Sequence, residues 1–140
     1  MKNRGIIYII LSFILWLVVE YITVWHARFD EWMSYMPLAL FQYLFIVLVF
    51  WFFLFIKKWN YKKIFIVMIV VMYIFEFLWQ NFLLLNIISF IPTSILLIQI
   101  WGFLTFIPFW LINRSIKQHI RSTIFYCLWP ALGFIMALFI

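Results

Sequence analysis

Five long apolar runs, each bounded by charged residues or by proline and asparagine, account for most of this chain. A helix needs about 20 apolar residues to cross a hydrocarbon layer of about 30 Å, and each run approaches that length. None alternates apolar and polar positions as a membrane barrel strand does. The pattern therefore predicts an all-α integral membrane protein, a bundle of five transmembrane helices. Their expected positions are about residues 5–25, 37–56, 64–85, 93–112 and 123–140.

Charged residues collect in the short segments between the runs and predict the orientation of the chain. Nine of the 10 lysines and arginines precede the first run or lie in the connectors after the second and fourth runs, whereas Arg28 lies on the opposite side. The positive-inside rule then places the N-terminus in the cytoplasm and the C-terminus outside. The first run is longer than the roughly 7–15 apolar residues of a secretory signal, so we expect it to remain as a helix. We expect residues 1–140 to form a single polytopic domain in the cell membrane.

Composition strengthens this interpretation, because 70% of the residues are apolar, 25% are aromatic and only 10% are charged. A soluble domain carries about 25% charged residues, so this chain could not cover itself with a wettable surface. A soluble enzyme and a nucleic-acid-binding module are thereby excluded. The formal net charge of +6 belongs to the basic connectors, which we expect to face lipid headgroups. Membrane lipids are the expected partners, together with a homo-oligomer or a membrane partner subunit, because so small a bundle has little interior.

Few strongly polar side chains lie within the runs, and those few share one depth. Placing a charge at the bilayer centre costs about 2.5–3.5 kcal/mol on insertion scales, so each needs a structural or functional reason. Counting 1.5 Å per residue puts an acid or amide from four different helices in the outer half of the membrane. We predict a single outward-opening pocket. Its expected ligand-binding side chains are Glu20, Gln42, Tyr73, Glu76, Gln80 and Gln99.

A structural role is the alternative for each of these residues. Glu20 lies within two turns of the outer boundary and can extend toward headgroups, and the amides can form hydrogen bonds between helices. Gln99 shares a face with Gly102, where a neighbouring backbone or a ligand can approach closely. Glu76 is too deep to reach the headgroups, so it must face protein or a wet cavity. Trp101 lies at a similar depth, and we expect it to pack inside the bundle.

Above the predicted pocket, His26, Asp30 and Glu31 are candidates for its rim. On a helical continuation of the first run, His26 and Asp30 would lie side by side, and Glu31 would extend the face that carries Glu20. Histidine with carboxylates is metal-ligand chemistry, but the usual zinc spacings are absent. We therefore predict a solvated rim with an interfacial aromatic belt, and we expect no metal and no cofactor.

Two kinds of activity fit a carboxylate-centred pocket. The first is binding or transport, in which Glu76 or Glu20 exchanges a proton for a small polar, cationic or amphiphilic ligand. The second is an enzyme that acts on a membrane-dissolved lipid or isoprenoid, with one carboxyl group donating a proton and the other stabilising a developing cation. The chain carries no Gly-rich phosphate loop and no Cys-x-x-Cys pair. We assign no catalytic residue, and whether the protein is an enzyme stays open.

Part of this layout is similar to the membrane-bound lycopene cyclases, in which an acidic residue near a helix end precedes an aromatic loop. Here Glu20 and residues 32–37 take those positions. Where that family carries a paired acidic motif at the start of the next helix, this chain reads Pro37-Leu-Ala-Leu-Phe-Gln42. The resemblance covers under a quarter of the chain and implies the lipid or isoprenoid enzyme. A third class is an accessory subunit, whose polar side chains would meet a helix of a partner protein.

Overall fold

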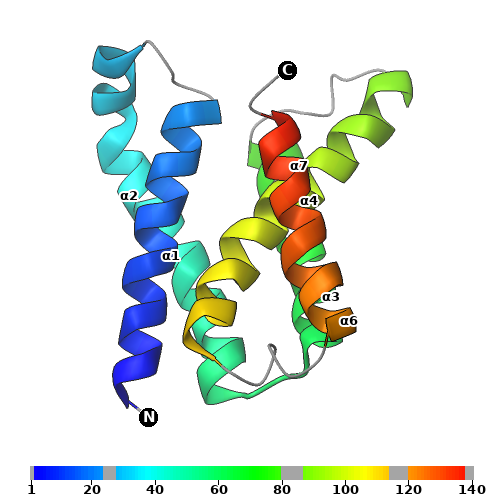
Figure 1. Cartoon of the computed structure of the whole chain (residues 1–140). Helices are drawn as coiled ribbons and strands as arrows, with labels where there is room; N and C mark the ends of the chain where they lie inside the picture. Colours follow the sequence, from blue (N-terminus) through cyan, green and yellow to red (C-terminus); the bar gives the residue numbers. More distant parts are fainter. Residues whose placement is uncertain (1, 24–27, 80–86, 114–119, 138–140) are drawn as a thin grey trace. The chain divides into compact units, whose positions relative to one another are not determined.

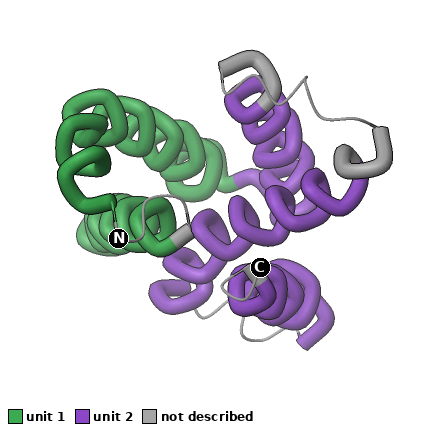
Figure 2. The backbone as a smooth tube through the Cα atoms, turned by 90° about the horizontal axis from the view of Figure 1, so that it is seen from above, with its two compact units in different colours: residues 1–58 green, residues 59–140 purple. Residues whose placement is uncertain are grey.

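The computed structural model is all-helical and describes residues 2–23, 28–79, 87–113 and 120–137 (Figure 1). The chain divides into two compact units, Met1–Lys58 (unit 1) and Trp59–Ile140 (unit 2), which are coloured separately in Figure 2. Each unit is described by itself below. The all-helical class predicted from the apolar runs is confirmed.

Unit 1 consists of two helices packed side by side. Helix α1 is Lys2–Thr23, and α2 is Phe29–Trp51, continued by the π-helical segment η1, Phe52–Ile56. Aromatic side chains fill the contact between them. The rings of Trp16 and Tyr43 are stacked, with their centroids 5.2 Å apart. Gly5 is required for close approach here, because a Cβ at this position would lie 2.5 Å from the indole Nε1 of Trp51.

The second helix begins earlier than the apolar pattern predicts. It starts at Phe29, so Pro37 lies inside α2 and does not open it. A proline inside a membrane helix is tolerated where neighbouring groups satisfy the freed backbone carbonyl. Asp30 and Glu31 fall in the first turn of α2, where the positive end of the helix dipole favours carboxylates. Asp30 and Glu31 therefore belong to the second helix, and the side-by-side placement considered for a continuation of the first helix does not apply to them.

Unit 2 is built around one long helix, α4, Ile87–Ile112. On one side lies α3, Tyr61–Tyr73, which continues as the π-helical η2, Ile74–Trp79. Against α4 also pack the C-terminal elements η4 (Ile124–Leu128) and α7 (Trp129–Ala137), and the short helix α6 (Ile120–Thr123) leads into η4. The Asn60 side chain caps α3 by accepting a 3.0 Å hydrogen bond from the Lys63 backbone N–H.

Small or flexible side chains let the helices of unit 2 approach one another. The residues of α3 that are fully buried, Ile64, Met68 and Met72, recur every four positions and so form one face of the helix. At Gly102 of α4, an added Cβ would lie 3.1 Å from Cγ of Pro130 on α7. A neighbour does approach closely at Gly102, but it is the side chain of Pro130 in α7, whereas the sequence predicted a backbone or a ligand.

Within the residues that the structure describes, three helices are long and apolar enough to cross a membrane: Asn3–Ile22, Phe29–Ile56 and Ile91–Ile112. The apolar helical stretch Ile120–Met136 is shorter. Large apolar side chains cover the outside of these helices, and Phe41, for example, is 73% exposed. Contiguous apolar surface of this kind is costly in water and is typical of proteins that contact lipid.

Candidate functional site

The one acidic side chain in the sequence of unit 2, Glu76, is held between two helices. Glu76 lies in η2, and its Oε1 accepts a 2.9 Å hydrogen bond from the indole Nε1–H of Trp101 on α4. Trp101 is 1% exposed, and its ring lies 6.0 Å from that of Phe75. Glu76 itself is half-buried. The carboxylate is therefore fixed at the contact of η2 with α4 and has aromatic rings as neighbours.

The local backbone around Glu76 is unusual. In a π-helical segment the hydrogen bonds span five residues instead of four, and such segments are frequent at functional sites. The described chain also contains π-helical segments at Phe52–Ile56 and Ile124–Leu128, so the backbone alone does not single out a site. Of the three segments, η2 is the one whose sequence includes a carboxylate.

Gln99 joins α4 to α7. Its Nε2 donates a 3.3 Å hydrogen bond to the backbone carbonyl of Trp129. Gly133 lies directly against the Gln99 side chain, and a Cβ added there would overlap Cβ, Cδ and Oε1 of Gln99. Gln99 thus has the structural role that was the alternative for the amides, a hydrogen bond between helices.

In unit 1, Gln42 is buried within α2 and its partner comes from the same helix. Its Oε1 accepts a 2.6 Å hydrogen bond from the hydroxyl of Tyr35, two turns earlier. Among the described residues, its Nε2 has no hydrogen-bond partner. Glu20 of α1 is half-buried and interacts with another residue.

The predicted pocket members are divided between the two units. Glu20 and Gln42 belong to unit 1, whereas Tyr73, Glu76 and Gln99 belong to unit 2. Gln80 lies outside the described residues. Within unit 2, the hydrogen bond of Glu76 joins η2 to α4, whereas that of Gln99 joins α4 to α7. A single pocket that unites all of these side chains stays a prediction.

At the predicted rim, the carboxylates stabilise the start of α2. Arg28 Nη1 lies 3.3 Å from Oε2 of Glu31, and both side chains are more than half exposed. The Ser34 hydroxyl donates a 2.7 Å hydrogen bond to the Glu31 carbonyl. His26 lies outside the described residues. In the part of the chain that is described, no three His, Cys, Asp or Glu side chains gather to hold a metal ion.

Trp101, for which the sequence predicted packing inside the bundle ahead of stacking on a ligand, is the hydrogen-bond donor to Glu76. The signal available was its depth: a buried indole usually finds a partner for its N–H, and acceptors at bilayer depth are few. Glu76 was one of them.

The sequence matches no family model, and neither a curated protein nor a solved structure is significantly similar to it.

Proposed function

We propose that this chain is a multi-pass protein of the cell membrane that binds and transports a small cationic or amphiphilic ligand at Glu76. The observation that carries the proposal is the hydrogen bond between Glu76 and the buried indole of Trp101.

The proposed topology has five spans with the N-terminus in the cytoplasm and the C-terminus outside. The helical stretches 61–79 and 120–137 rise roughly 28 Å and 27 Å at 1.5 Å per residue, which approaches the hydrocarbon thickness of about 30 Å. The basic connectors before the third and fifth helices lie on one side in this arrangement, as the positive-inside rule requires.

The surroundings of Glu76 favour a cation. The nearest basic residue before it on its own helix is Lys63, 13 positions earlier and roughly 20 Å along the axis. Residues 87–112, which form α4, include no Lys, Arg or His. A bare carboxylate at bilayer depth is costly, so a bound proton or cation would stabilise it.

The aromatic neighbours add selectivity for organic cations. The faces of Phe and Trp rings attract a desolvated cation by about 2 kcal/mol or more. Phe75 and Trp101 supply such rings beside the carboxylate. Because the Trp101 N–H fixes one carboxylate oxygen, the charge keeps its position when a ligand binds. Competition between a proton and the cation for this one group supplies the exchange that transport requires.

The test compares the wild type with Glu76→Gln, using Glu20→Gln as the matched control. The glutamine oxygen can still accept the Trp101 hydrogen bond, so the variant removes the charge and keeps the contact. Each protein is purified in mild detergent and its thermal unfolding is followed during titration with tetraphenylphosphonium. A ligand at 100 times its Kd stabilises the folded state by about 2.7 kcal/mol.

We expect stabilisation of the wild type and of Glu20→Gln, and its loss in Glu76→Gln. Equal stabilisation of all three proteins, or none in the wild type, would contradict the proposal. With reconstituted vesicles, uptake of the same cation coupled to proton release is expected for the wild type and not for Glu76→Gln.

A further inference from the structure

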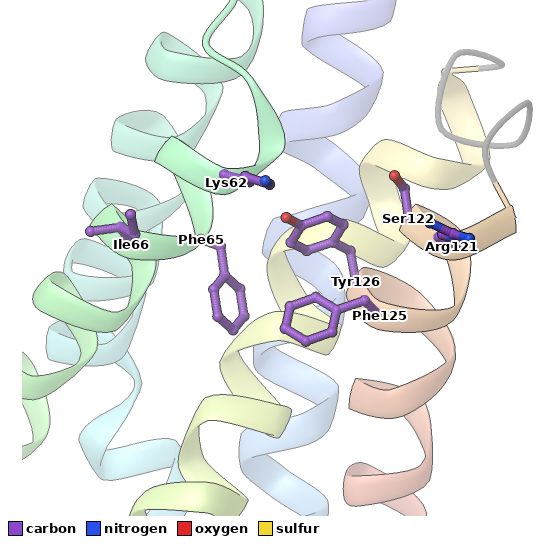
Figure 3. Close-up of a pocket in the computed structure, with 7 residues that line it drawn as sticks. All are labelled: Lys62, Phe65, Ile66, Arg121, Ser122, Phe125 and Tyr126. Carbon is purple, nitrogen blue, oxygen red and sulfur yellow. The ribbon is translucent and has the colours of Figure 1, made fainter.

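A pocket of about 490 Å³ lies between the start of α3 and the α6–η4 segment of unit 2 (Figure 3). Two cationic side chains line it, Lys62 from α3 and Arg121 from α6. Figure 3 shows the Lys62 ammonium directed across the pocket toward the Tyr126 hydroxyl, with Ser122 and Arg121 beyond it. The polar atoms therefore gather at one end of the pocket.

The rest of the pocket wall is aromatic and apolar. The ring centroids of Phe65 and Phe125 lie 5.3 Å apart, and each lies within 6 Å of the Tyr126 ring. Ile66 and Phe125 are 60% and 47% exposed, although both line the pocket. Charged groups thus border an apolar surface that is open to an occupant from outside the chain.

Within unit 2, the sequence offers these two cations no acid close to them. Of the chain's four acidic residues, only Glu76 belongs to unit 2, and it follows Lys62 by 14 positions, roughly 21 Å along the helix. No ion pair of Lys62 or Arg121 occurs within the described residues. Lys62 also lies in the first turn of α3, where backbone N–H groups already concentrate positive charge. This end of the pocket is therefore complementary to an anion.

We propose that this pocket binds the headgroup of an anionic phospholipid, with the phosphate between Lys62 and Arg121 and an acyl chain along Ile66 and Phe125. Inorganic phosphate would satisfy the cations but would leave the exposed apolar wall uncovered. A lipid satisfies both, since a phosphate and an alkyl chain are covalently joined. This site is distinct from the cation site at Glu76, and either can exist without the other.

The experiment titrates the full chain, purified in a neutral detergent, with three probes in separate arms. These are dioctanoyl phosphatidylglycerol, dioctanoyl phosphatidylcholine and inorganic phosphate, and thermal unfolding reports binding. We expect saturable stabilisation by phosphatidylglycerol and much weaker stabilisation by the other two. Equal stabilisation by inorganic phosphate at the same concentration would overturn the lipid assignment.

Neighbouring residues on α3 provide matched control variants. Lys62→Gln and Lys63→Gln remove the same charge from adjacent positions, but only Lys62 lines the pocket. We expect Lys62→Gln to raise the Kd for phosphatidylglycerol about fivefold, and Lys63→Gln less than twofold. Equal weakening by both would mean that the lipid responds to the connector charge in general, and the proposal would fail.

The apolar wall is tested in the same way. Ile66→Ser changes a side chain that lines the pocket. Ile74→Ser changes a similarly exposed isoleucine that lies farther along the same helix and does not line the pocket. We expect Ile66→Ser to weaken phosphatidylglycerol binding severalfold and Ile74→Ser to leave it unchanged. If both isoleucine variants bind as the wild type does, the acyl chain does not follow this wall.

Discussion

Gln42 of unit 1 and Gln99 of unit 2 are the same residue type at the same predicted depth, yet they bond in different ways. The Gln42 amide oxygen meets a hydroxyl of its own helix, Tyr35. The Gln99 amide reaches across from α4 to the Trp129 carbonyl of the C-terminal helical stretch. A hydrogen bond within one helix does not hold helices together, whereas a bond between helices adds to their association.

Glu76 extends the contrast, because its bond with Trp101 also joins two helices. In unit 2, close contacts between a glycine and a side chain of another helix and hydrogen bonds between helices occur along the same helix, α4. In unit 1, the contact between α1 and α2 includes the stacked Trp16 and Tyr43 rings, with Gly5 admitting Trp51. Replacing a polar residue is therefore expected to weaken the packing between helices more in unit 2 than in unit 1.

The largest effect is expected where α7 touches Gln99. Gly133→Ala places a methyl group on the Gln99 side chain, and overpacking of this kind costs about 1–3 kcal/mol. The measurement is the free energy of unfolding in mixed detergent micelles. Gly102→Ala is the matched control: both substitutions gain about 1 kcal/mol in helix propensity, but the methyl group at position 102 meets Pro130 less closely than the one at position 133 meets Gln99. Equal destabilisation by the two variants would show that Gly133 does not mark a closer approach.

A smaller effect is expected at the bond between Glu76 and Trp101. Trp101→Phe keeps an aromatic ring near Phe75 but removes the N–H that Glu76 accepts. The expected loss is about 0.5–2 kcal/mol of unfolding free energy, from the lost volume and the lost donor. A double-mutant cycle with Glu76→Ala isolates the pairwise energy. A coupling energy of zero would mean that this contact does not join the helices.

The sequence predicted the helices well because apolar length and charged boundaries are local properties of the chain. The start of α2 was missed, because Pro37 and the charges at residues 28–31 were interpreted as a connector. Asp30 and Glu31 were in fact a readable signal for a helix N-terminus. Helical spacing also correctly marked Gly102 as a place of close approach.

The partners of the polar residues were harder to predict. Periodicity assigns a side chain to a helix face, but it does not say which residue packs opposite. Gln99 shares a face with Gly102, yet the sequence alone does not reveal that Gly133 lies against its side chain. Lys62 and Phe65 were assigned to different features, a connector and a helix, although they line one pocket with Phe125.

The smallest effect is expected in unit 1, and it tests whether Gln42 has only a local role. Tyr35→Phe removes the donor to Gln42 and leaves its buried oxygen without that bond, which costs about 1 kcal/mol. Gln42→Met removes the whole amide, including the Nε2 that has no partner in the described part of the chain. Because a methionine of similar volume needs no hydrogen bond, we expect Gln42→Met to change the unfolding free energy by less than about 0.5 kcal/mol. If Gln42→Met instead costs more than Trp101→Phe, Gln42 has an essential partner beyond α2, and the contrast between the two units breaks down.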